Sequence, residues 1–105
     1  MSIRSATLTL TGAVQSLSDC GLPTNVFRQL LLTADPDNSV PINFSGKDDL
    51  LDEDNWGFQI FAPSPPAVVN IQPVIIFANV GIASINELKL LGAENDILHI
   101  TVIYP

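Results

Sequence analysis

The stretch SATLTLT, residues 5–11, is the clearest indication of a β-fold because its polar and apolar residues alternate without a break. Successive side chains of a β-strand point to opposite faces, so Ala6, Leu8 and Leu10 share one face and the Ser and Thr side chains share the other. This pattern predicts a strand with one buried face and one polar face, and Gly12 marks its end.

The segment ILHITVIY, residues 97–104, has the same period of two. Its side chains Leu98, Ile100, Val102 and Tyr104 fall on one face. We therefore predict a second strand of the same kind near the C-terminal end of the sequence.

Five more segments are predicted to be strands, because apolar or β-branched runs are bounded by Gly, Pro, Asn and Asp. They are residues 26–34, 40–44, 56–61, 68–77 and 85–91. Segment 26–34 contains Leu30-Leu31-Leu32, which is typical of a strand covered on both faces, although the period alone does not exclude a helix. Segment 68–77 is one strand interrupted at Pro73 or two short strands.

Two of these segments carry a further indication of their place in a sheet. Pro41 puts segment 40–44 at an edge or at one end of its ladder, because proline has no N–H to donate. Segment 85–91 alternates, with Leu88 and Leu90 predicted to face inward and Glu87 and Lys89 outward.

No ten-residue stretch carries a helical stripe, and the one helix candidate is a turn or two at residues 48–54. Seven or eight short strands separated by turns predict an all-β fold, a small antiparallel β-sandwich of the jelly-roll or immunoglobulin-like kind. A length of 105 residues is that of one domain, residues 1–105.

Charged residues make up only 14% of the chain and hydrophobic residues 47%. A chain this apolar buries enough surface to offset the entropy of ordering, which argues against intrinsic disorder. Four Lys and Arg against eleven Asp and Glu argue against phosphate binding, so we expect no nucleic acid partner. The low charge leaves either a neutral Ser, Thr and Asn surface or an exposed apolar patch, and such a patch marks an interaction surface.

The longest apolar segment, residues 74–85, is too short for a membrane span. The residues after Arg4 alternate between Thr and Leu and form no continuous apolar stretch of a signal peptide. We therefore expect no membrane association and no secretory signal.

The acidic segment DDLLDEDN, residues 48–55, is the first candidate for a metal site. From Asp52 it begins like a calcium loop, but Trp56 and Pro63 occupy the fifth and twelfth positions, where the loop needs ligands. The segment at Asp35, Asp37 and Asn38 has oxygen donors, and turns contain these residues anyway. We expect a solvated acidic loop, no metal site and no cofactor.

No catalytic constellation is found. His99 lies mid-strand and is expected to be an outward-facing or hydrogen-bonded histidine rather than a general base, and Cys20 has no neighbouring cation to stabilise a thiolate. Paired carboxylates are not excluded by their number, yet a sandwich of this size has little room for a walled cleft. We expect no enzyme and no catalytic residues.

An aromatic cluster leaves carbohydrate binding open. Trp56, Phe58 and Phe61 are candidates for a platform under a sugar ring, but Phe58 and Phe61 fall on opposite faces of a regular strand. At least one of the two is therefore expected in the core.

Three stretches in order carry a resemblance to a known group of proteins. They are LTGAVQSLS at residues 10–18, FRQLLLTADPDNS at residues 27–39 and INELKLLGAENDILHI at residues 85–100. Together they resemble the small β-sandwich structural proteins of tailed-bacteriophage virions, of the capsid decoration, head-fibre or tail accessory type. Segment 40–44, the acidic segment 48–55 and the proline connector at 63–66 depart from that pattern, which leaves head or tail open.

This resemblance implies a non-enzymatic virion protein made in the cytoplasm of the bacterial host. It implies a capsid decoration or cement protein that forms a homo-oligomer and stabilises the shell by contacts with the major capsid protein or other virion proteins. The alternatives are a tail or baseplate accessory protein and a carbohydrate- or receptor-binding module.

Two segments are the predicted partner interface, one near the N-terminus and one after Pro73. They are Thr7, Leu8, Thr9 and Leu10, and Val74, Ile75, Ile76 and Phe77. The alternative for both segments is that they are simply core strands.

Overall fold

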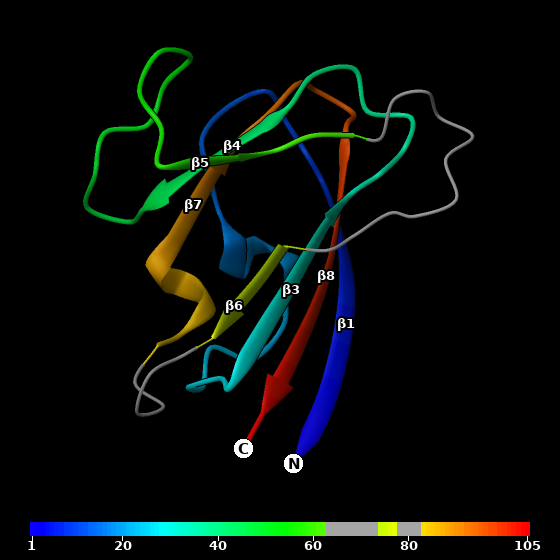
Figure 1. Ribbon diagram of the computed structural model, residues 1–105, viewed down its shortest axis with the longest axis vertical. Helices are drawn as coiled ribbons and strands as arrows, with labels where there is room; N and C mark the ends of the chain where they lie inside the picture. The colour runs from blue at the N-terminus through cyan, green and yellow to red at the C-terminus, as the bar shows by residue number, and fades with distance from the viewer. Residues whose placement is uncertain (63–73, 78–82) are drawn as a thin grey trace.

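The computed structural model describes residues 1–62, 74–77 and 83–105. These residues form eight strands and two short 3-10 helices (Figure 1). The elements are β1 (Ser2–Thr9), β2 (Gln15–Ser16), η1 (Leu17–Cys20), β3 (Gln29–Ala34), β4 (Ile42–Gly46), β5 (Phe58–Ile60), β6 (Val74–Phe77), η3 (Ile85–Glu87), β7 (Leu88–Leu91) and β8 (Ile97–Tyr104).

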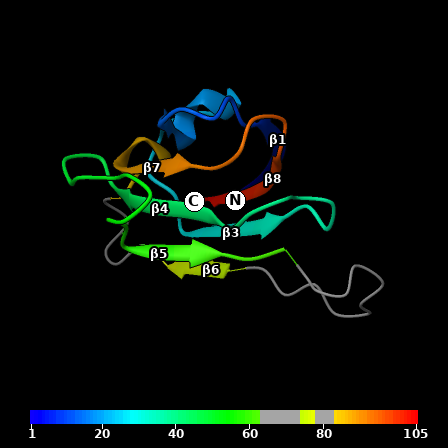
Figure 2. The ribbon, with the colours of Figure 1, turned by 90° about the horizontal axis from the view of Figure 1, so that it is seen from above.

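The strands form two antiparallel sheets of four. The first sheet has the order β1-β8-β3-β6 and the second the order β2-β7-β4-β5. The pairing is nested: β1 pairs with β8, β2 with β7, β3 with β6 and β4 with β5. Nested pairing of eight strands in two sheets is the connectivity of a jelly roll, so the predicted β-sandwich is confirmed in its jelly-roll form. Figure 2 shows β5 and β6 at one margin of the sandwich and η1 at the other.

Alternate side chains of both sheets fill one apolar core. The two central strands of the first sheet contribute the largest share of it, and the second sheet covers them. Core residues of β3, β8, β4 and β7 include Leu30, Leu32, Ala34, Leu98, Ile100, Val102, Ile42, Phe44 and Leu90. Phe58 stacks on Phe44 with ring centroids 4.9 Å apart, at the margin where β5 ends the second sheet.

The two alternating segments are strands, β1 and β8, and their side chains face as predicted. Leu8 and Leu10 are buried, whereas Thr7 and Thr9 are exposed. In β8, every apolar residue that was predicted to face inward is buried.

Several boundaries differ from the prediction for local reasons. The Leu30-Leu31-Leu32 run is less covered than a strand buried on both faces. Leu30 and Leu32 are buried, whereas Leu31, which points to the outer face, is only half-buried. Segment 85–91 starts as η3, where the Ser84 hydroxyl accepts a hydrogen bond from the Asn86 N–H and caps the turn. Residues 48–54 form turns and bends rather than a helix.

The strand after Pro41 is an interior strand. β4 lies between β7 and β5 and begins one residue after Pro41, so the proline stands at the end of its ladder and not at a sheet edge. β6 begins directly after Pro73, and the rest of the predicted strand 68–77 lies outside the described residues, as does the connector at 63–66.

Candidate interaction surfaces

The outer face of the first sheet carries no Asp, Glu, Lys or Arg at its described positions. The strand register places its outward side chains, none of which is fully buried: Ile3, Ser5, Thr7, Thr9, Gln29, Leu31, Thr33, Ile75, Ile97, His99, Thr101 and Ile103. We call this set the Thr/Ile face. It is a surface of β-branched and small polar side chains held on a rigid sheet.

The Thr/Ile face has an apolar pair at each edge of the sheet. Ile3 stands opposite Ile103, and Leu31 stands opposite Ile75. Ile3 is 63% exposed and Ile75 47% exposed. Large apolar side chains at this exposure are unfavourable in water, and burial by a partner would remove that cost.

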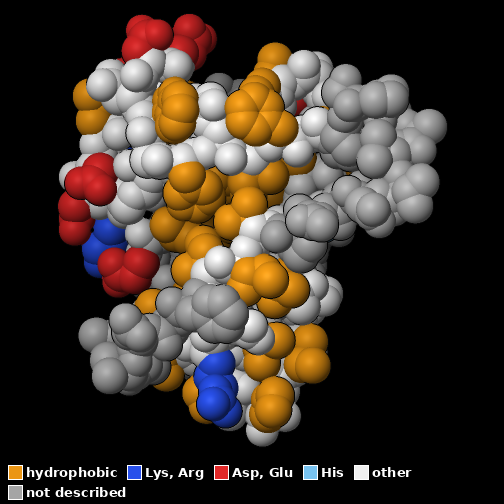
Figure 3. Space-filling view, viewed as in Figure 1, with side chains coloured by type: hydrophobic (Ala, Val, Ile, Leu, Met, Phe, Trp, Pro, Cys, Tyr) orange, Lys and Arg blue, Asp and Glu red, His pale blue; other side chains and the backbone are white. Residues whose placement is uncertain are grey.

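The carboxylates lie elsewhere. None of the eleven is in a strand; they occupy loops and 3-10 turns at Asp19, Asp35, Asp37, Asp48, Asp49, Asp52, Glu53, Asp54, Glu87, Glu94 and Asp96. In the space-filling view, acidic side chains gather toward one side and hydrophobic side chains occupy the middle (Figure 3). Of the eleven carboxylates, Asp35 contacts the Thr/Ile face, because its Oδ2 lies 2.9 Å from Nε2 of His99.

The predicted interface residues divide between the core and the Thr/Ile face. Leu8 and Leu10 are core residues, and Val74 and Ile76 pack against the core. Thr7, Thr9 and Ile75 lie on the Thr/Ile face, at opposite edges of the first sheet. The side chain of Phe77 lies outside the described residues.

The central part of the Thr/Ile face was not among the predicted interface residues. Leu31, Ile97 and Ile103 occupy outward positions of the two central strands. The signal was present in residues 97–104, where Ile97, Thr101 and Ile103 form the face opposite the predicted core residues.

His99 extends the polar part of the Thr/Ile face toward the turn after β3. Its Nε2 lies 2.9 Å from Oδ2 of Asp35, and the side chain is exposed, as expected for an outward-facing histidine. Asp35 Oδ1 also accepts a hydrogen bond from the Asp37 N–H at 3.0 Å. That backbone bond, followed by the bond to His99, holds the pKa of the Asp35 carboxyl below its ordinary value.

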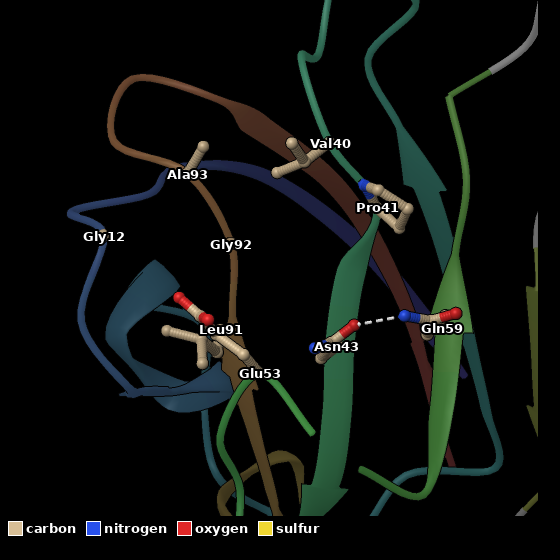
Figure 4. Close-up of a pocket in the computed structure, with 9 residues that line it drawn as sticks. All are labelled: Gly12, Val40, Pro41, Asn43, Glu53, Gln59, Leu91, Gly92 and Ala93. Atoms are coloured by element: carbon tan, nitrogen blue, oxygen red, sulfur yellow. Dashed lines mark hydrogen bonds between the residues drawn. The ribbon is translucent and has the colours of Figure 1, made fainter. Parts of the chain in front are cut away.

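A second candidate surface is a pocket on the outer side of the second sheet (Figure 4). It has a volume of about 400 Å³ and is lined by Gly12, Val40, Pro41, Asn43, Glu53, Gln59, Leu91, Gly92 and Ala93. Gln59 Nε2 donates to Asn43 Oδ1 at 2.7 Å, which pairs the amides of two neighbouring strands. Amides and a carboxylate beside apolar walls are groups that bind hydroxyl-bearing ligands.

The three aromatic candidates for a sugar platform, Trp56, Phe58 and Phe61, do not form one surface. Phe58 packs against the core, which confirms that at least one of Phe58 and Phe61 is a core residue. Trp56 and Phe61 are exposed and are not among the residues that line the pocket.

The acidic segment 48–55 folds back on one of its own carboxylates. Asp52 Oδ1 accepts hydrogen bonds from the N–H groups of Asp54 and Asn55, both at 2.8 Å. The bond from Asp54, then that from the Asn55 side chain, lowers the pKa of Asp52. Within residues 1–62, 74–77 and 83–105, no group of three His, Cys, Asp or Glu side chains is arranged to hold a metal ion.

Comparison with known proteins gives no relative. No protein-family model matches the chain, no curated protein matches it, and no solved structure matches it. In the part of the chain that the structure describes, no helix is long and apolar enough to cross a membrane.

Proposed function

We propose that this chain is a non-enzymatic structural protein of a tailed-bacteriophage virion, and that it attaches to the shell as a capsid decoration or cement protein. The observation that carries the proposal is the Thr/Ile face, whose strand positions hold no Asp, Glu, Lys or Arg on a chain with net charge −7, and which a carboxylate meets at Asp35, beside His99. The resemblance of residues 10–18, 27–39 and 85–100 to such virion proteins supplies the class of partner.

Attachment through the Thr/Ile face is favourable on physical grounds. β-branched side chains on a sheet lose little conformational freedom when they are covered, and the strand positions of this face present no Asp, Glu, Lys or Arg to desolvate. The carboxylates lie in loops and 3-10 turns rather than on the strands of this face, and Asp35 reaches it through its bond to His99. A jelly roll also occurs in viral capsid domains, lectins and cupins, so the fold supports the proposal by analogy alone.

The first test is the copy number of the chain in intact particles purified from its source, measured by mass spectrometry against the major shell protein. Near-stoichiometric amounts are expected for a decoration or cement protein. A few copies per particle would instead assign it to the tail or to a vertex. Its absence from the particles would overturn the virion role.

A second test locates the contact. Thr101→Lys places a charge in the middle of the Thr/Ile face, and we expect it to weaken rebinding to stripped particles by roughly tenfold or more. Val14→Lys is the matched control, because Val14 is exposed and lies off the Thr/Ile face. Equal rebinding of the two variants would exclude the Thr/Ile face as the attachment site.

The pocket of the second sheet favours one alternative, a saccharide-binding module. The supporting observation is the Asn43–Gln59 amide pair beside Glu53 in a cavity of about 400 Å³. A glycan array probed with the wild-type chain tests it, with Gln59→Ala to remove one amide and Asp19→Ala as a surface control away from the lining residues. Glycan binding that is lost only in Gln59→Ala would favour the module over the shell protein.

A further inference from the structure

We infer that two copies of this chain associate through β1, side by side and antiparallel, so that their first sheets join into one continuous eight-stranded sheet. The location of such a dimer in a particle rests on the proposed function. The pairing itself rests on β1 and is tested on the purified chain, so either can fail without the other.

β1 is an open edge with strand-type hydrogen-bonding groups. Its described strand partner is β8 alone, and in Figure 1 it runs along the margin of the first sheet with no strand beyond it. Natural sheets protect their edges by short strands, prolines, bulges, inward-pointing charges or a covering helix or loop. The other edge strands are short, with two residues in β2, three in β5 and four in β6, whereas β1 has eight.

β1 has few of these features: Arg4 is a charge at a core-facing position opposite Val102, and η1 contacts the strand. It contains no proline and no glycine, and its register with β8 is unbroken from Ser2 to Thr9. Its one charged side chain is Arg4, at the exposed start of the strand. An eight-residue edge of this kind is a template for another strand.

The ladder shows which backbone groups of β1 are available. The Leu10 N–H donates to the Asp96 carbonyl at 2.8 Å, and the Asp35 N–H donates to the Ile97 carbonyl at 3.1 Å. Because bonding residues alternate along an antiparallel strand, both bonds imply that even-numbered residues of β1 bond to β8. The N–H and C=O groups of the odd-numbered residues then point to the open edge: Ile3, Ser5, Thr7 and Thr9.

The distribution of charge selects a second copy as the partner. Arg4 lies near the start of β1, and the exposed Glu94 lies against Gly12 just beyond its end. Antiparallel pairing sets the basic end of one β1 beside the acidic end of the other, so the attraction is made twice in a two-fold dimer. A parallel arrangement would place like ends together.

The geometry also selects a register. The outward N–H and C=O groups of β1 belong to odd-numbered residues, so odd-numbered residues must pair with odd-numbered residues. Paired residues point their side chains to the same face of the joined sheet. All four outward-bonding residues find partners when Ala6 lies on the two-fold axis, with Ser5 opposite Thr7 and Ile3 opposite Thr9 of the second copy. In this register the two Thr/Ile faces lie on the same side of the joined sheet.

The test is the molar mass of the purified chain in solution, by light scattering on a size-exclusion column over a range of concentrations. We expect the wild type to be a dimer. Thr7→Pro deletes an outward N–H, and an edge strand tolerates proline there, so we expect its dimer to dissociate roughly tenfold more readily or to be lost. Thr7→Val retains the N–H and is expected to remain a dimer.

A second measurement protects the test against misfolding of the proline variant. Hydrogen exchange of the wild type across the dimer transition should slow at the amides of Ile3, Ser5, Thr7 and Thr9 and stay unchanged at Leu30 and Leu32 in the sheet centre. A monomeric wild type at hundreds of micromolar overturns the inference. A dimer in which the four β1 amides exchange at the monomer rate overturns it as well.

Discussion

The Asn38 side chain pairs with the backbone of Ile97 as a neighbouring strand would. Its Nδ2 donates to the Ile97 carbonyl and its Oδ1 accepts from the Ile97 N–H, both at 2.8 Å. The Asp35 N–H donates to the same carbonyl at 3.1 Å. The turn after β3 is thereby tied to the first residue of β8 by residues of the Ala-Asp-x-x-Asn stretch at 34–38.

Asn38→Ala is expected to lower the free energy of unfolding by about 1–3 kcal/mol, because it leaves the Ile97 N–H without its partner and the Ile97 carbonyl with the Asp35 N–H alone. Urea unfolding followed by fluorescence measures the change. Asn25→Ala is the matched control, since Asn25 is exposed and its removal is expected to change stability by less than about 0.5 kcal/mol. Equal effects of the two substitutions would contradict the role given to Asn38.

Asp96 secures the next residues of the same turn. Its carboxylate is buried and accepts hydrogen bonds from the N–H of Ser39 at 3.0–3.1 Å and from the Ser39 hydroxyl at 3.1–3.2 Å. Asp96→Ala is expected to destabilise the fold by about 2–3 kcal/mol, and Ser39→Ala by about 1 kcal/mol, because Ser39→Ala retains the backbone bond. Thermal unfolding of both variants would reveal this order, and the reverse order would refute it.

Acid should weaken the fold through Asp35. The pKa of Asp35 is lower in the folded chain than the ordinary value of 3.8, so its stabilising contribution is present above that value and is lost as the pH falls through the folded pKa. The stability difference between wild type and Asp35→Asn is therefore expected to be full near about pH 5 and to shrink toward about pH 2. Chemical unfolding at several pH values measures it. A difference independent of pH would disprove the linkage, and Asp37→Asn serves as the control in the same turn.

Gly92 and Gly21 are expected to resist substitution for different reasons. A β-carbon on Gly92 would overlap the Leu10 side chain in the core, and we expect Gly92→Ala to cost about 1–3 kcal/mol. Gly21 has nothing within 4 Å but has a φ of +86°, so Gly21→Ala is expected to cost about 1 kcal/mol through backbone strain.

A second substitution separates the two causes. Leu10→Val removes the overlapping methyl group and should reduce the penalty of Gly92→Ala while leaving that of Gly21→Ala unchanged. Unfolding free energies of the single and double variants form the cycle. Full additivity at Gly92 and Leu10 would show that the overlap is relieved elsewhere.

The sequence predicted the sandwich because most of its strands are amphipathic and its turns use residues with defined backbone preferences. Residues 97–104 alternate as cleanly in the structure as in the sequence. Asp35 and Asn38 form the predicted turn through bonds of their own side chains. These are local properties, which a single sequence carries.

The pairing of the strands could not be predicted from the sequence. Alternation shows which face of a strand is buried, but not which strand lies beside it. The choice between a jelly roll and an immunoglobulin-like sandwich therefore needed the pairing itself. β2 was missed because two residues, Gln15 and Ser16, show no period, and they are a strand only through their bonds to Leu90 and Lys89.

Only part of the Thr/Ile face was predicted from the sequence. Segments were proposed as whole units, and a strand in a sandwich exposes only alternate residues. Leu8 and Leu10 thus belong to the core, and their neighbours Thr7 and Thr9 belong to the Thr/Ile face.

The place of β8 has a consequence for how fast this chain folds. β8 is a central strand of the first sheet, between β1 and β3, yet it follows every other strand in sequence. Ser2 meets Tyr104 across the ladder, a separation of almost the whole chain. Loops of that length close slowly, so folding is expected to belong to the millisecond-to-second class of non-local β proteins. Until residues 97–104 are in place, β1 has both edges open, and the folding chain is then most exposed to aggregation.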